Sequence, residues 1–154
     1  MKPLVGRVVR FVSHRIGAAD RSRLERALRG PLRRRAVLWT LFGAMPRFIR
    51  RRALERENIV VEWRITGRRD GRQDVRQLVI GDGAAAVLEG EPHEADLILT
   101  LSSVDFLLVA TGNAMGPALF VSGALELEGD PWLAMRLPRI FGAPGPPREP
   151  RPTA

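Results

Sequence analysis

Alternating apolar and polar residues mark five short segments of the chain as β-strands. Over residues 59–65, apolar side chains occupy every second position, which is the pattern of a strand with one buried face. An Asp-Gly pair at 70–71 and a Gly-Asp-Gly turn at 81–83 predict hairpins between the first three strands. The remaining expected strands occupy residues 75–80, 84–88, 96–101 and 124–128.

A helical spacing of apolar residues dominates the first third of the chain. Residues 3–17 place apolar side chains about four positions apart, with basic residues largely on the other side, which predicts an amphipathic helix with a basic face. Asp20 can cap a second helix, and Pro31 suits the first turn of a third. Pro46 either kinks this third helix or begins a further one over residues 47–56.

The segment after the fourth strand carries clear helix start and stop signals. Ser102 has the spacing of a capping box and predicts a helix over residues 103–111. Pro117 opens a short second helix. Asp130 is placed to cap the last helix, which Pro138 should kink or shorten.

Together these elements predict an α+β fold: a sheet of about five strands, one face covered by helices, preceded by basic N-terminal helices. We expect residues 1–30 to form a basic amphipathic helical extension and residues 31–141 to form the domain. Residues 142–154 are rich in proline, which predicts a disordered tail.

The charge of +8 is distributed very unevenly. Residues 1–56 hold 16 basic and 3 acidic residues, whereas residues 57–154 hold 9 and 14. Such asymmetry indicates an anionic partner for the first third, such as nucleic acid, anionic lipid or an acidic protein. The alternative is an ordinary solvated face rich in arginine.

Candidate catalytic and metal-binding groups are few. There is no cysteine, and His14 and His93 lie in different regions without acidic partners at ligand spacing. Glu126, Glu128 and Asp130 alternate out of a strand and can hold a cation, although a solvated face explains them better. The sequence contains none of the hydrolase, metalloprotease or phosphate-loop motifs. We therefore predict a protein that is not an enzyme and needs no cofactor or metal.

The order of these signals resembles the sterol carrier protein 2 (SCP2) family of lipid-binding domains. The likeness covers residues 57–141, and bacterial members are the most similar in their helical N-terminus. Residues 113–116 depart from the family pattern, as does Pro138 within the last helix. The segments that carry the likeness are Ala95–Ser102, Asp105–Gly112, Pro117–Asp130 and Leu133–Leu137.

The resemblance implies an apolar tunnel that holds a sterol, a fatty acyl chain or an isoprenoid for carriage or presentation at a membrane. The alternative for the same apolar residues is an ordinary packed core. The residues expected to line the tunnel are Phe106, Leu107, Met115, Phe120, Leu125, Leu127, Trp132, Met135, Leu137 and Phe141.

Other functions use the basic first third. The resemblance to bacterial proteins also implies an accessory role in isoprenoid-quinone biosynthesis through protein contacts, and nucleic-acid binding is a weaker alternative. The longest uncharged run, residues 106–125, is broken by glycine and proline, so we expect a cytoplasmic protein that is at most peripheral on a membrane. The basic residues expected to contact a membrane or a partner are Arg7, Arg10, Arg15, Arg47, Arg50 and Arg51.

Overall fold

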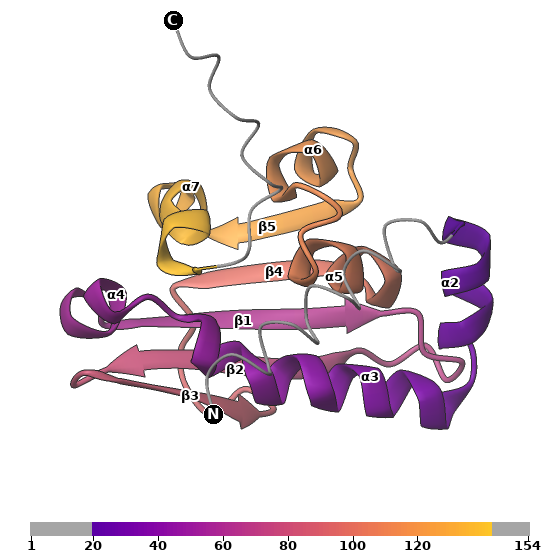
Figure 1. The fold of residues 1–154 in the computed structure, drawn as a ribbon, viewed down its shortest axis with the longest axis horizontal. Coiled ribbons are helices and arrows are strands. Elements are labelled where there is room, and N and C mark those ends of the chain that lie inside the picture. Colours follow the sequence, from indigo (N-terminus) through magenta and orange to yellow (C-terminus); the bar gives the residue numbers. More distant parts are fainter. Residues whose placement is uncertain (1–19, 143–154) are drawn as a thin grey trace, which may run out of the picture.

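The computed structural model describes residues 20–142, which form a five-stranded sheet with helices packed on one face (Figure 1). The strands are β1 (Ile59–Thr66), β2 (Asp74–Gly81), β3 (Ala84–Glu89), β4 (Leu97–Ser102) and β5 (Leu125–Gly129). The helices are α2 (Arg21–Leu28), α3 (Pro31–Ala44), the 3-10 turn η1 (Met45–Phe48), α4 (Arg51–Arg56), α5 (Ser103–Ala110), α6 (Gly116–Val121) and α7 (Pro131–Ile140).

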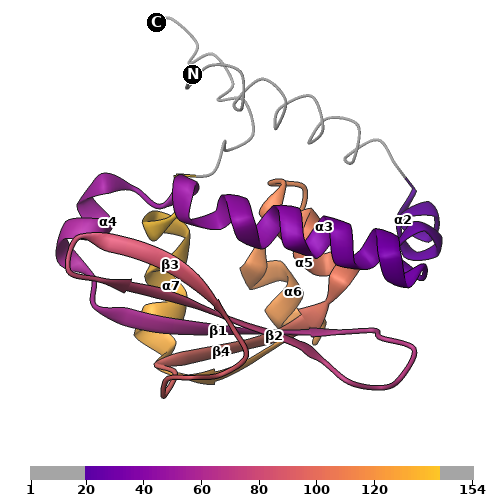
Figure 2. The ribbon, with the colours of Figure 1, turned by 90° about the horizontal axis from the view of Figure 1, so that it is seen from below.

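The strand order is β3-β2-β1-β4-β5, with β1 and β4 parallel and the other neighbours antiparallel. Each strand lies within two residues of the range that alternation predicts. Figure 2 shows α3, α5, α6 and α7 on the same side of the sheet. The predicted α+β fold, with one face of the sheet covered by helices, is confirmed.

The two faces of the sheet differ in chemistry because strand residues alternate sides. Val61, Trp63 and Ile65 of β1 are buried on the inner face, under the helices. On the outer face, the Gln77 amide donates to a Glu62 carboxylate oxygen at 2.8 Å and to the His93 carbonyl at 2.8 Å. The loop after β3 therefore covers these two polar residues and satisfies them.

Helix α5 is fixed at its start by the predicted capping interaction. The Ser102 hydroxyl accepts from the Asp105 backbone N–H at 3.1 Å and donates to the Asp105 carboxylate at 2.8 Å. The same carboxylate accepts from the Arg21 guanidinium at 2.8 Å, which attaches α2 to α5 and raises the pKa of Arg21. One buried carboxylate thus joins a cap to a contact between helices.

The last helix begins as predicted but tolerates its proline. Asp130 accepts from the backbone N–H groups of Trp132 and Leu133. Helix α7 continues past Pro138 and ends at Ile140, so the proline lies in the last turn, where it lacks the N–H that would donate to the Ala134 carbonyl.

The prediction of a helix over residues 47–56 was wrong in its first half. Pro46 lies in the 3-10 turn η1, and Ile49 is extended before α4 begins at Arg51. The reason is a long-range contact. Ile49 forms a β-bridge with Phe141, and the Arg50 N–H donates to the carbonyl of Ile140, the last residue of α7. The sequence around Pro46 carries no sign of this pairing.

Three aromatic side chains from three elements meet at the centre of the core. Phe42 of α3 stacks on Phe106 of α5 with ring centroids 4.7 Å apart, and Phe106 meets Trp63 of β1 edge-on at 5.3 Å. All three are buried. The expected helix over residues 3–17 and residues 143–154 of the expected tail lie outside the described residues.

We predict that Phe106→Ala lowers the free energy of unfolding by about 3–5 kcal/mol, because it removes the ring that bridges α3, α5 and β1. The matched control is Phe120→Ala, whose ring is 54% exposed and should cost less than about 1 kcal/mol. Urea unfolding followed by circular dichroism measures both. Equal losses for the two variants would contradict this core assignment.

Candidate functional site

The ten residues expected to line a tunnel separate into three groups. Phe106, Leu125 and Leu137 are buried in the main core, whereas Leu107 packs in a separate cluster against α2. The half-buried residues at the edge of the main core are Leu127 and Phe141. The exposed residues are Met115, Phe120, Trp132 and Met135.

The exposed group forms part of an apolar rim, which we define as Met115, Phe120, Val121, Trp132 and Met135. These side chains are between 54% and 86% exposed, although all five are large and apolar. They come from α6, the residue before it, and α7, the helices that precede and follow β5 and lie at its two ends (Figure 1). Large exposed apolar side chains mark contact sites in soluble proteins where they form a continuous patch.

Val121 belongs to the rim although it was not among the predicted lining residues. Its exposure, 86%, is the highest of the group. The signal was the helical spacing, since a helix packed on a sheet turns only one side toward it and successive residues point in different directions. Leu119 takes that inward position and packs on the core, so Phe120 and Val121 point away from it.

The interior beneath the rim is filled by side chains. Across the inner face of the sheet, Trp63 of β1 is opposite Leu99 of β4, which is opposite Leu127 of β5. Trp63 and Leu99 are buried and Leu127 is half-buried. This row therefore leads from the middle of the core to the edge strand between the rim helices.

Two shallow hollows on the described surface lie elsewhere, on α2 and the start of α3. The first, of about 390 Å³, is lined by Arg23, Arg26, Ala27 and Arg33. The second, of about 340 Å³, is lined by Arg26, Ala27, Gly30, Pro31, Leu32 and Arg33. Both are basic, and neither includes a residue expected to line the tunnel.

The predicted basic contact residues are only partly described. Arg47, Arg50 and Arg51 are exposed, and Arg51 pairs with Glu55 one helical turn later. Arg7, Arg10 and Arg15 lie outside the described residues. The exposed Arg23, Arg26 and Arg33 of the hollows were not predicted, although they belong to the same arginine-rich stretch.

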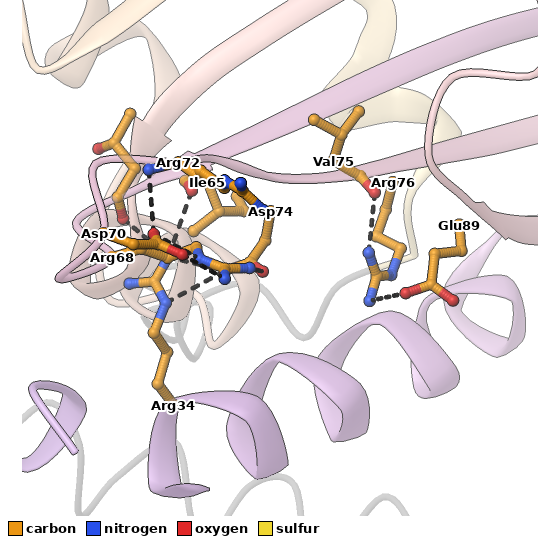
Figure 3. A network of polar contacts seen from close by, with 10 residues as sticks. Arg34, Ile65, Arg68, Asp70, Arg72, Asp74, Val75, Arg76 and Glu89 are labelled. Atoms are coloured by element: carbon orange, nitrogen blue, oxygen red, sulfur yellow. Dashed lines mark hydrogen bonds and ion pairs between the residues drawn. The ribbon is translucent and has the colours of Figure 1, made fainter. Parts of the chain in front are cut away.

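One arginine of that stretch has a structural role. Arg34 is buried, and its guanidinium donates to the Asp74 carboxylate at 3.0 Å and to the Thr66 carbonyl at 2.9 Å (Figure 3). Arg68 closes the network by donating to Asp74 and Asp70, and the Arg68–Asp70 contact lowers the pKa of the Asp70 carboxyl. Figure 3 shows this network joining α3 to the β1–β2 hairpin.

Two buried donors lack a hydrogen-bond partner among the described residues: Nη1 of Arg34 and Nε1 of Trp63. The Arg34 side chain is otherwise well bonded, but the indole N–H is the only hydrogen-bonding group of the Trp63 side chain. The sequence predicted Trp63 to face inward and gave no sign that its N–H would be left unpaired.

Between residues 20 and 142, no three histidine, cysteine, aspartate or glutamate side chains gather as a metal site would require. The longest helix in that range, α3, has 14 residues, and none there combines the length and apolar composition of a membrane span.

Comparison with known sequences finds a protein family that matches this chain. The model described as the SCP-2 sterol transfer family matches residues 49–142. Hydroxysteroid dehydrogenase-like protein 2 from Xenopus tropicalis is 28% identical over 102 residues, which are 66% of this chain and 24% of that protein. This chain thus spans about a quarter of the length of the first curated relatives that it matches.

Solved structures share the fold at low sequence identity. Sterol carrier protein 2 like 2 from Aedes aegypti has a TM-score of 0.53 and 16% identity, over 70% of this chain and 98% of that one. The UbiJ-SCP2 ubiquinone synthesis protein has a TM-score of 0.51 and 17% identity, over 71% of this chain and 96% of that one.

We predict that Asp74→Ala lowers the free energy of unfolding by about 3 kcal/mol, because it leaves the buried Arg34 charge without its carboxylate. The matched control is Asp70→Ala, which removes an exposed partner of the same Arg68 and should cost no more than about 1 kcal/mol. Thermal and urea unfolding of both variants test this difference. A loss for Asp74→Ala no larger than that for Asp70→Ala would show that Arg34 does not depend on Asp74.

Proposed function

The chain belongs to the SCP-2 sterol transfer family, and from that premise we propose that it binds a lipid without catalysis and carries or presents it at a membrane. The ligand is of sterol, fatty acyl or isoprenoid type. The apolar rim is the single observation that carries this proposal beyond the family, because five large apolar side chains remain exposed within residues 115–135.

The free energy for binding comes from burying the rim and the lipid chain together. Each methylene removed from water contributes about 0.8 kcal/mol, so even part of an acyl or prenyl chain gives useful affinity. Apolar walls distinguish ligands by only about 1–3 kcal/mol per methylene, so the selection of chain length is loose. In this proposal no bond is made or broken. We do not assign this chain the dehydrogenase-like function that the relative's name suggests.

Helix α6 is the cover that we expect to move when lipid enters. It has six residues, none of which is completely buried, and it is followed by Gly123 in the left-handed region at φ 79°. Leu119 is the side chain through which it packs on the core. Few buried apolar contacts mean that local opening costs little free energy, and opening here uncovers Leu125 and Leu127 of β5.

The arginine-rich helices are proposed to bring the protein to an anionic surface. The described residues 20–56 contain 12 arginines and 3 acidic residues, and Arg23, Arg26 and Arg33 gather around one hollow. Arg47, Arg50 and Arg51 extend this exposed basic segment. Each basic residue near an anionic membrane contributes about 1 kcal/mol.

A second candidate is an accessory role in isoprenoid-quinone synthesis. The fold shared with UbiJ-SCP2 favours it, since that protein is described as a ubiquinone synthesis protein. In that case the bound lipid is a prenylated aromatic compound, and residues 1–30 hold the protein to biosynthetic enzymes. Two results would distinguish this candidate from general lipid carriage. The purified protein would contain a quinone precursor, and it would pull down such enzymes only when residues 1–30 are present.

We predict that the purified protein carries lipid detectable by native mass spectrometry and binds a fluorescent fatty acid in solution. Replacing Phe120, Val121 and Trp132 together by Ser should weaken binding at least about tenfold, since several apolar contacts are lost. The control replaces Leu32 and Trp39, which are 82% and 79% exposed on α3, by Ser and should stay within about twofold. Absence of any bound lipid, or equal loss in the two variants, removes the support for this site.

We also predict binding to vesicles that contain phosphatidylglycerol and little binding to vesicles of phosphatidylcholine alone. Replacing Arg23, Arg26 and Arg33 by Gln should weaken binding about 100-fold, the equivalent of about 1 kcal/mol for each charge. A control with the same loss of charge replaces the exposed Arg69, Arg72 and Arg139 by Gln. Vesicle cosedimentation at rising salt measures the effect. If the control variant lost vesicle binding to the same degree, the attraction would depend on net charge and not on this basic hollow.

A further inference from the structure

The indole N–H of Trp63 is a buried donor without an acceptor among the described residues. The side chain is 6% exposed, and Nε1 has no hydrogen-bond partner among the described residues. A donor left in this state costs free energy comparable to a lost hydrogen bond, so buried N–H groups almost always find an acceptor. An unpaired donor at the centre of a core therefore requires an explanation in terms of water, strain or a ligand.

The surroundings of Trp63 supply few acceptors. Its ring contacts the Phe106 ring edge-on, and Phe106 in turn stacks on Phe42. An aromatic face is a weaker acceptor than an oxygen atom. Arg76 lies opposite Trp63 on β2, but its guanidinium donates to the Val75 carbonyl and pairs with Glu89. These neighbours add donors and apolar surface rather than a free oxygen.

The position of Trp63 connects this donor to the apolar rim. Along the inner face, Leu99 and then Leu127 separate Trp63 from the edge of the sheet at β5. Neighbouring strands are about 4.8 Å apart, so Trp63 lies about 10 Å inside the edge strand. A lipid chain that enters at β5 between α6 and α7 must displace the side chains there and pass Leu127 and Leu99 before its leading end meets Trp63.

We propose that Trp63 donates its indole N–H to an oxygen at one end of the bound lipid, which enters with that end first. The hydrocarbon chain then runs outward over Leu99 and Leu127 to the apolar rim. This inference rests on the proposed lipid-binding function. It adds the orientation of the lipid and names the indole N–H of Trp63 as the group that binds its polar end.

The preferred oxygen is uncharged. A carboxylate beside Trp63 would need a counter-charge, and Arg76, the cation opposite it, is already paired with Glu89 at 3.1 Å. A ketone, quinone or alcohol oxygen accepts the hydrogen bond without that cost. Lipids of isoprenoid-quinone, sterol or fatty alcohol type share this chemistry, and free fatty acids fit it less well.

The test uses Trp63 itself as the reporter. The chain has three tryptophans, so Trp39→Phe with Trp132→Phe leaves Trp63 as the only indole and keeps the rim apolar. Two bromoalkanols of equal length are compared, one with bromine beside the hydroxyl and one with bromine at the far methyl end. We expect the first to quench Trp63 at least about threefold more strongly. Stronger quenching by the second would reverse the orientation and overturn the proposal.

A second measurement isolates the hydrogen bond. Trp63→Phe keeps an aromatic ring but removes the donor, and it should weaken binding of the alkanol about fivefold to tenfold. An alkyl chloride of the same length, which offers no good acceptor, should bind the two proteins within about twofold of each other. Because the quenching test needs no substitution at Trp63, it remains decisive if this variant folds poorly.

The outcomes separate this inference from the proposed function. If the alkanols bind but quench Trp63 equally from both ends, and Trp63→Phe binds as the unsubstituted protein does, the donor is satisfied by water or by Phe106 and the inference fails while lipid binding stands. If neither the alkanols nor the fluorescent fatty acid bind the unsubstituted protein, the proposed function and the inference fail together. Better binding of a fatty acid than of the alkanol would contradict the preference for an uncharged oxygen.

Discussion

The contact of Phe42, Phe106 and Trp63 is the constraint on which the rest of the structure depends. Each ring comes from a different element, and the three elements are distant in the chain, so the contact fixes α3 and α5 on the centre of the sheet at once. Aromatic pairs in offset or edge-on geometry add about 0.5–1.5 kcal/mol beyond the apolar area they bury. The indole N–H of Trp63, one of these three rings, is buried without a hydrogen-bond partner among the described residues.

A small number of charged contacts set where the helices lie around this centre. Arg34 holds α3 to the β1–β2 hairpin, and Arg21 holds α2 to the start of α5. Arg136 of α7 pairs with Glu57 after α4, which ties the last helix to the basic segment. Most of the remaining arginines in residues 20–56 are exposed and pair with no carboxylate of the described residues, so the basic surface is what is left after these structural pairs are formed.

The two halves of the molecule thus offer different surfaces. Helix α3, η1 and α4 lie over the β2–β3 side of the sheet, α2 packs beside α5, and α6 and α7 lie beside β5 (Figure 1). The proposed lipid site and the proposed anionic contact surface therefore lie on different helices.

The sequence by itself determined the elements and the family. Strand alternation, the Ser102 and Asp130 caps and the turn at 81–83 are local signals, and the structure follows them because caps and turns act within a few residues. Only the tertiary structure decided which apolar residues are core and which are surface. Phe106 and Phe120 looked alike in the chain, but Phe106 is held between two rings whereas Phe120 lies on the side of α6 that faces away from the core. The bridge between Ile49 and Phe141 and the unpaired Trp63 N–H depend on residues far apart in the chain, so no local pattern could reveal them.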